Sequence, residues 1–203
     1  SNCRVVAGDD AIKIRANGSA LTKGGTPACE RVVVSNCSLQ SHAGAISFGW
    51  IGDGLIRDCV FSNITIVDSA SGINFVVPRF EQGMTDVGTA EPRFENISFN
   101  SIVMDRIYSS PTSLSFSCKK KDKSAIVKNV SFTDVRCKAL KFPSFRANSS
   151  CPIEDVVLRG CSFTRVADGD FPEKWQKKGA AWWARPTPER FMAVRGLRYD
   201  GCT

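Results

Sequence analysis

The chain has 203 residues, 42% hydrophobic and 23% charged, so disorder is not indicated and one domain with a sizeable core is expected. No run of about eighteen apolar residues occurs, which excludes a transmembrane helix. The net charge of +7 would attract polyanions, but the basic residues are scattered and form no helical stripe typical of groove binding. We therefore expect neither a nucleic-acid partner nor a membrane partner.

The chain opens on a strand-like run over residues 1–6, as if a strand were already under way, so we expect the natural N-terminus to lie upstream.

Two adjacent aspartates, in Gly8-Asp9-Asp10, follow this run. Adjacent carboxylates repel when both are ionised, so one tends to keep its proton unless cations or donors compensate. Inverting glycoside hydrolysis uses a protonated carboxyl and an ionised one, about 6.5–9.5 Å apart. The alternative is a plain turn, since Gly and Asp both favour turns.

Short runs that alternate apolar and polar residues, as half-buried strands do, recur in pairs along the chain. The pairs are 31–37 with 45–49, 54–61 with 72–77, 94–99 with 113–116, 127–132 with 140–142, and 153–158 with a weaker 163–166. Units that cannot bury their own apolar face predict a solenoid, and two or three strands per repeat favour an all-β parallel β-helix. A β-sandwich is the main alternative, but Asn17-Gly18 is the one tight hairpin signal.

The nine cysteines include no Cys-x-x-Cys pair, so a zinc cluster is not expected. Five of them end one recurring local pattern, which predicts a structural slot where each small side chain stacks on its equivalent in the next repeat: Cys3, Cys37, Cys59, Cys161 and Cys202. Three cysteines outside this slot are better disulfide candidates: Cys118, Cys137 and Cys151. We expect no metal ion and no cofactor.

Five Asn-x-Ser/Thr triplets would be glycan acceptors in a eukaryotic secretory pathway: those at Asn17, Asn63, Asn96, Asn129 and Asn148. Asn and Ser are so frequent in turns that chance explains the triplets about as well.

The repeat pattern breaks at residues 167–190, where Trp175, Trp182 and Trp183 stand among lysines and alanines. We interpret 1–166 as β-helix rungs, with the active-site segments at 8–10 and 41–50, and 167–203 as a Trp-rich loop and C-terminal cap with the last strand. An aromatic sugar platform is the alternative for the tryptophans.

Two segments resemble glycoside hydrolase family 28, the polygalacturonase group. Residues 8–14 read GDDAIKI and are similar to the family's Gly-Asp-Asp-x-Ile-x-Ile, and residues 41–49 read SHAGAISFG and are similar to its Gly-His-Gly-x-x-Ile-Gly. The resemblance implies a right-handed parallel β-helix that hydrolyses pectic or related plant cell-wall polysaccharide with inversion. It implies Asp9 as general acid, Asp10 as a carboxylate that activates water, and His42 as a group that tunes the acid or contacts the sugar.

Three departures from the family pattern stand out. No residues carry the family's upstream Asn-Thr-Asp, whose aspartate is a further water-activating carboxylate. We therefore expect a C-terminal fragment that lacks the N-terminal rungs. The resemblance implies a secreted protein, extracellular or periplasmic, whose signal peptide is not in this sequence. Asn74 and Val76 replace the Arg-x-Lys pair that binds uronate, so the substrate is a neutral or differently decorated sugar unless Arg79 approaches from the adjoining segment. Ala43 replaces the first Gly after His42.

Trp50 directly follows the second motif and would lie at a strand end on the active-site face, where its ring either stacks on sugar or simply packs. With Asn74 and Arg79 it completes the expected substrate-binding set of a monomer that acts on poly- or oligosaccharide.

Two other functions stay open. One is a Ca-dependent polysaccharide lyase on the same fold, and the other is a catalytically impaired β-helical glycan-binding protein, which the loss of the Arg-x-Lys pair favours.

Overall fold

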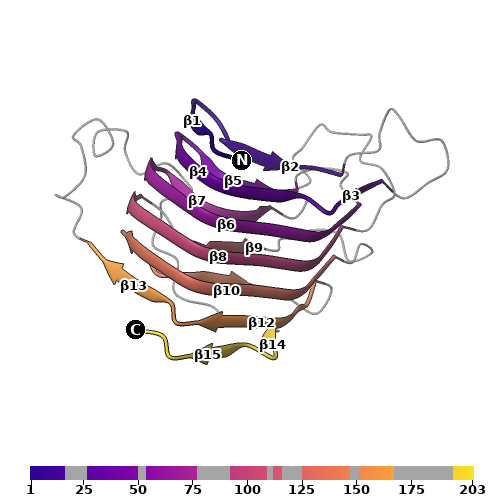
Figure 1. Cartoon of the computed structure of the whole chain (residues 1–203). Helices are drawn as coiled ribbons and strands as arrows, with labels where there is room; N and C mark the ends of the chain where they lie inside the picture. The colour runs from indigo at the N-terminus through magenta and orange to yellow at the C-terminus, as the bar shows by residue number, and fades with distance from the viewer. Residues whose placement is uncertain are drawn as a thin grey trace, which may run out of the picture.

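The computed structural model describes residues 1–16, 27–49, 54–76, 92–108, 112–115, 125–146, 151–166 and 194–203, of which 76, 112–115, 146 and 194 are described by their backbone. These ranges contain strands and connections and no helix. Within them, no helix is long and apolar enough to cross a membrane. Strands stack one above another along the molecule, as Figure 1 shows. The expectation of an all-β protein is therefore confirmed for the described part of the chain.

One large sheet runs the length of the molecule, and all its pairings are parallel. Its main strands lie in the order β1 (Arg4–Ala7), β4 (Val33–Ser41), β6 (Leu55–Ser69), β8 (Arg93–Ile107), β10 (Ile126–Ala139), β12 (Ile153–Arg159) and β14 (Val194–Arg195). Three further short strands each pair with one stretch of a main strand, beside a neighbour that pairs with another stretch of it. They are β3 (Ala28–Glu30) on β6, β13 (Ser162–Arg165) on β10, and β15 (Arg198–Asp200) on β12.

A second, smaller parallel sheet consists of β2 (Ile12–Ile14), β5 (Gly44–Phe48), β7 (Ser71–Val76), β9 (Thr112–Ser115) and β11 (Ser144–Arg146). From β4 to β12 the chain alternates between the two sheets, so each passage through both adds one rung. Hairpins of a β-sandwich would require antiparallel neighbours, and every pairing in the described residues is parallel. The architecture is that of a parallel β-solenoid.

The long strands bend at residues with a left-handed backbone, which stack into three columns along the solenoid. In the first column φ lies between 53° and 57° at Arg31, Asp58, Asn96, Asn129 and Asp155. In the second it lies between 51° and 58° at Asn2, Asn36, Asn63, Ser101 and Asp134, and Gly160 and Gly201 continue that column. The third column consists of Asp68 and Arg106, with φ of 47° and 53°. Asn, Asp and Gly tolerate this conformation best, which explains their recurrence here. Five positions separate successive bends of a rung, as between Asp58 and Asn63.

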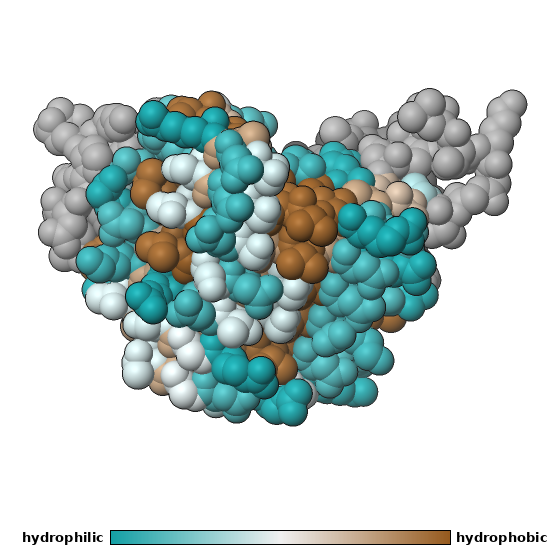
Figure 2. All heavy atoms as spheres, viewed as in Figure 1, coloured by the Kyte–Doolittle hydropathy of each residue, from teal (hydrophilic) through white to brown (hydrophobic). Residues whose placement is uncertain are grey.

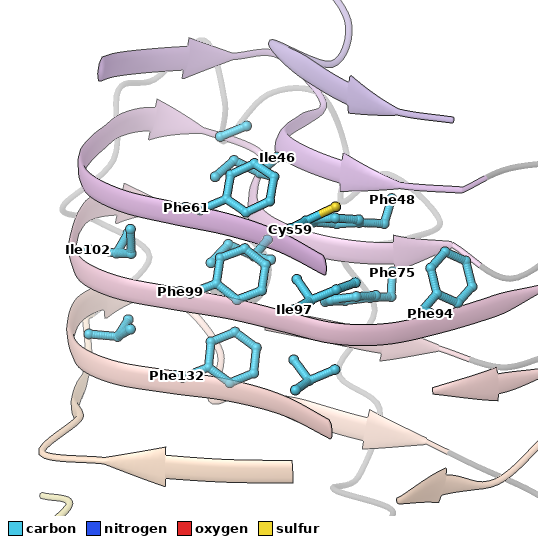
Figure 3. Packing of buried hydrophobic residues seen from close by; sticks show 14 of the residues in the cluster. Ile46, Phe48, Cys59, Phe61, Phe75, Phe94, Ile97, Phe99, Ile102 and Phe132 are labelled. Carbon is cyan, nitrogen blue, oxygen red and sulfur yellow. The ribbon is translucent and has the colours of Figure 1, made fainter. Parts of the chain in front are cut away.

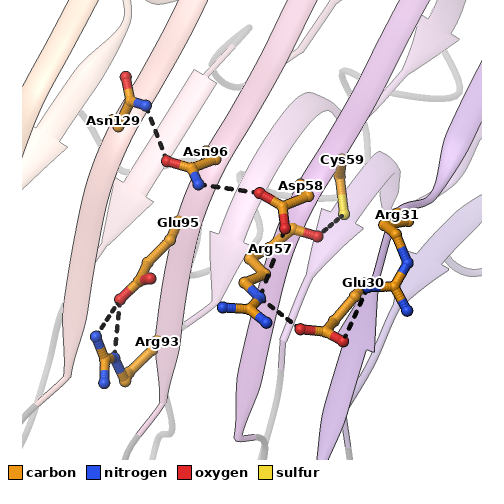
Figure 4. A network of polar contacts seen from close by, with 9 residues as sticks. All are labelled: Glu30, Arg31, Arg57, Asp58, Cys59, Arg93, Glu95, Asn96 and Asn129. Atoms are coloured by element: carbon orange, nitrogen blue, oxygen red, sulfur yellow. Dashed lines mark hydrogen bonds and ion pairs between the residues drawn. The ribbon is translucent and has the colours of Figure 1, made fainter.

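Side-chain amides in these columns bond from rung to rung. Asn63 Nδ2 donates to Asn36 Oδ1 at 2.7 Å in the second column. In the first column Asn129 Nδ2 donates to Asn96 Oδ1 at 2.9 Å, and Asn96 Nδ2 donates to Asp58 Oδ1 at 2.9 Å (Figure 4). The amides thus both relax the bend and link successive rungs.

This geometry accounts for three of the Asn-x-Ser/Thr triplets. Asn63, Asn96 and Asn129 occupy bends, the next residue of each points into the core, and the Ser or Thr after it is on the outer side. The bend favours Asn, the next position faces the core, and the outward position after it favours a small polar residue such as Ser or Thr. The fold alone therefore explains these triplets. Asn17 and Asn148 lie outside the described residues.

The core between the sheets is built from two columns of phenylalanine (Figure 3). In the large sheet Phe99 stacks on Phe61 at 5.2 Å and on Phe132 at 4.9 Å between ring centroids. In the small sheet Phe48 stacks on Phe75 at 4.6 Å, with the planes 7° apart. The two columns meet edge to face, as Phe48 and Phe99 do at 5.8 Å and 85°. Both arrangements suit the quadrupole of an aromatic ring.

The predicted cysteine slot is confirmed in part. Cys3 lies beside Cys37 and Cys161 beside Cys202 on neighbouring rungs, whereas Cys59 follows a bend of the first column and is in register with Ile97. Each of its members follows a left-handed residue and directs its thiol to the carbonyl oxygen two residues earlier, as Cys37 Sγ does to Ser35 O at 3.2 Å and Cys59 Sγ to Arg57 O at 3.3 Å. The disulfide prediction is wrong for Cys137, which is a buried free thiol whose pKa burial raises. Cys118 lies outside the described residues.

Two strand predictions are corrected. Residues 140–142 form no strand, because Leu140 packs beside Ala70, Tyr108 and Val166 and the strand of that rung is β11. The run at 163–166 corresponds to β13, which pairs with β10 in the large sheet and does not belong to the small one. The Trp-rich segment, residues 167–190, lies outside the described residues, and β14 and β15 pair with β12 as the next rung.

The outer face of the large sheet is mainly polar. Figure 2 shows teal and white spheres over this side of the molecule, interrupted by smaller brown areas. Among the exposed large hydrophobic residues are Val33 and Val60, which lie in register on β4 and β6. A small apolar area of this kind is normal on a protein surface.

Candidate functional site

The two adjacent aspartates lie on the connection that carries the chain from β1 in the large sheet to β2 in the small one. Asp9 is exposed and Asp10 is partly buried. The backbone N–H of Asp10 donates to Asp9 Oδ1 at 2.9 Å, which is a common way for Asp to stabilise a turn. The segment is therefore a turn, as one interpretation held, and it also presents two carboxyl groups with different surroundings.

Donors from three positions hold the carboxylate of Asp10. Its Oδ1 accepts the backbone N–H of Gly44 at 2.9 Å and the hydroxyl of Ser47 at 2.8 Å. Its Oδ2 is 2.9 Å from Lys13 Nζ. Gly44 and Ser47 belong to β5 and Lys13 to β2, so neighbouring strands of the small sheet fix the position of one side chain. In the described part of the chain, the Asp9 carboxylate has no comparable set of donors beyond the backbone N–H of Asp10.

His42 lies on the equivalent connection of the next rung, between β4 and β5, and its side chain is exposed. Its backbone N–H donates to Ala7 O at 3.1 Å. One residue earlier, the buried Ser41 donates from Oγ to the backbone oxygen of Asp9 at 2.6 Å. The two sequence motifs therefore lie side by side, and backbone and side-chain hydrogen bonds join them.

Asn74 on β7 borders the same carboxylate from the third rung. It is in register with Ser47, which is itself in register with Lys13. The Oδ1 of Asn74 accepts the hydroxyl of Ser71 at 2.5 Å. A methyl group built on Gly44 would lie 2.8 Å from Asn74 Nδ2 and 2.8 Å from Asp10 Oδ1. Gly44 thus leaves just enough room for the amide and the carboxylate to approach.

Four of the six predicted site residues are in the described part of the chain. Asp9, Asp10, His42 and Asn74 come from three successive rungs at one end of the small sheet. Trp50 and Arg79 lie outside the described residues. The roles that the sequence suggested for all six stay predictions.

Neither Lys13 nor Ser47 was among the predicted site residues, although both lie inside the two motifs. Strand alternation could have placed them together. Ile14 and Phe48 are buried and in register, so the preceding residues, Lys13 and Ser47, face the opposite side of the small sheet. Alternation does not show that the carboxylate of Asp10, which lies outside any strand, contacts both of these side chains.

Charge at the site is nearly balanced. The Lys13 ammonium compensates the Asp10 carboxylate, so Asp9 stands beside a neutral pair instead of a second bare anion. In the described ranges no group of three His, Cys, Asp or Glu side chains is arranged to hold a metal ion. The site combines an exposed carboxyl, a fixed carboxylate and an exposed imidazole next to amide and hydroxyl groups.

No protein-family model, no curated protein and no solved structure matches this chain.

Proposed function

We propose that this protein is a polygalacturonase-like glycoside hydrolase, which cleaves pectic or related plant cell-wall polysaccharide with inversion on a right-handed parallel β-helix. The observation that carries the proposal is the meeting of Asp9, Asp10 and His42 on adjacent connections above the small sheet. We further propose that it is a secreted monomer that uses neither metal nor cofactor. The resemblance of residues 8–14 and 41–49 to family 28 supports this assignment.

The surroundings of the two aspartates suit different tasks. Asp9 is exposed, so its carboxyl can reach a glycosidic oxygen and donate a proton as the bond to the anomeric carbon breaks. Asp10 is fixed by three donors, which leaves a lone pair to accept a proton from the attacking water. His42, on the next rung, would contact the sugar or the acid. The products are an alcohol and a hemiacetal of inverted configuration.

The proposal is tested with protein expressed from its complete coding sequence, assayed for new reducing ends on polygalacturonate, rhamnogalacturonan and neutral cell-wall glycans. Proton NMR of the first product gives the stereochemistry. We expect D9N and D10N each to lower kcat by about 10²- to 10⁴-fold. D134N is the matched control, because Asp134 lies at a left-handed bend that Asn also tolerates.

Full hydrolysis by D9N and D10N, or an unchanged anomeric configuration, would contradict the proposal. Products with an unsaturated, ultraviolet-absorbing sugar would indicate a lyase instead.

One observation favours a second function, that of a glycan-binding protein without catalysis. The lysine paired with Asp10 and the amide at Asn74 form a polar surface that can bond sugar hydroxyls. Calorimetry that shows oligosaccharide binding, with no product after prolonged incubation, would favour this alternative.

A further inference from the structure

Lys13 occupies a position where it contributes charge directly to the candidate site. It lies in the middle of β2, and its Nζ is 2.9 Å from Asp10 Oδ2. The side chains of Lys13 and Asp10 are 25% and 20% exposed, so the pair is partly shielded from solvent. Partial shielding makes a charge pair less sensitive to salt than a fully exposed one.

The contact completes a set of restraints on Asp10. Gly44 N–H and Ser47 Oγ both reach Oδ1, and two donors on one oxygen still permit the carboxylate to swing about that oxygen. Lys13 holds the other oxygen from the neighbouring strand. The plane of the carboxylate is thereby fixed from both sides.

We propose that Lys13 is a positioning residue for Asp10, which fixes Oδ2 and neutralises the charge beside Asp9. This inference rests on the proposed hydrolase function. Lys13 does not itself contact the reacting atoms in this scheme. Its effect is to give the two adjacent aspartates different tasks, because one carboxylate is held in a neutral pair and the other stays exposed.

The same pairing limits what Lys13 can do for a substrate. The charge of an ammonium paired with Asp10 is already compensated, so it attracts a sugar carboxylate less than an unpaired lysine would, although its other N–H groups can still donate to hydroxyls. The described neighbours in the same register, Ser47 and Asn74, are uncharged. Lys13 therefore serves the carboxylate and not the recognition of a uronate.

The ion pair itself is tested without any activity assay. A water-soluble carbodiimide activates a carboxylate, and an amine in contact with it displaces the urea to form an isopeptide bond, with loss of one water from the protein. We expect trypsin to leave peptide 5–15 of the treated protein uncut at Lys13 and lighter by one water, with the bond assigned to Asp10 by fragmentation. K13R cannot form this bond and is the control. Absence of the bond in the unmodified sequence would overturn the inference.

The positioning role is tested by kinetics on the glycan that the protein hydrolyses fastest. We expect K13M to lower kcat by about 10- to 100-fold with KM within threefold, and K13R to restore kcat to within threefold. K128M, which removes an exposed lysine from the large sheet, should leave both constants unchanged. Wild-type kcat in K13M would show that the pair is merely structural.

A protein that forms the isopeptide but hydrolyses no glycan would contradict the proposed function, and with it a positioning role in catalysis. A protein that hydrolyses glycan but forms no isopeptide would contradict the Lys13 inference alone.

Discussion

Asn96 and Asp58 share one backbone conformation on neighbouring rungs, with φ of 54° and 56°, and the amide of Asn96 bonds the carboxylate of Asp58 at 2.9 Å. Asn96 also accepts the amide of Asn129 at 2.9 Å. One exposed side chain thus links three rungs while its own backbone stays in a region that most residues avoid.

Substitutions of Asn96 separate the cost of its left-handed backbone from the contribution of its two side-chain hydrogen bonds. We expect N96A to lose about 1–3 kcal/mol of unfolding free energy, because Ala bears the cost of the left-handed bend and makes neither hydrogen bond. N96G avoids the backbone cost and should lose less. Urea denaturation followed by circular dichroism measures both variants. Equal stability of N96A and the wild type would show that the ladder contributes nothing.

Phe99 is the central ring of the core, since it stacks on rings above and below and meets the rings of the small sheet edge on. We expect F99A to cost about 3–5 kcal/mol, which includes the cavity left behind. F142A is the comparison, because Phe142 is 45% exposed, and it should cost clearly less than F99A. Similar losses in the two variants would contradict the described core.

Gly44 offers a direct test of the site geometry. A Cβ there would lie 2.2 Å from Ser47 Oγ and 2.8 Å from Asp10 Oδ1, so the hydrogen bonds around the carboxylate must break or shift. We expect G44A to lower kcat/KM by about 100-fold or more while costing about 1–3 kcal/mol of stability. G8A is the matched control, since a Cβ at Gly8 meets nothing within 4 Å. Glycan cleavage and thermal melting of both variants give the comparison, and an active G44A would contradict the proposed site.

Tyr108 makes stability depend on alkaline pH. Burial raises the pKa of its hydroxyl from 10.0 to about 12, so the folded state holds the phenolic proton where the unfolded chain releases it. This contribution is complete below about pH 10 and is lost as pH rises through about 12. Urea midpoints between these values should fall more steeply in the wild type than in Y108F. Parallel curves would show that Tyr108 does not titrate differently on folding.

Much of the fold was predictable from alternation, because both halves of the first three strand pairs correspond to strands of the two sheets. The bends were harder to predict. Asn63 and Asp134 are residue types that favour a left-handed backbone, but Ser101 and Arg31 adopt it as well without any such preference. Their conformation is imposed by the rungs on either side, which a single segment of sequence does not reveal.

The site was predictable in its motifs and not in its contacts. Two segments identified Asp9, Asp10 and His42, and the parallel register brings those segments together. The pairing of Lys13 with Asp10 could not be predicted, because the turn of the chain between them decides which way the carboxylate points.

The constant separation of five positions between the bends of a rung, as from Asn96 to Ser101 and from Asn129 to Asp134, also bears on how such a protein can change. A single-residue insertion inside that interval would swap inward and outward side chains on one side of a bend and break the match with both neighbours. Duplication or deletion of an entire rung would preserve every match. Length variation in relatives of this chain should therefore come in whole repeats or in the connections, and a designer could exchange complete rungs as modules.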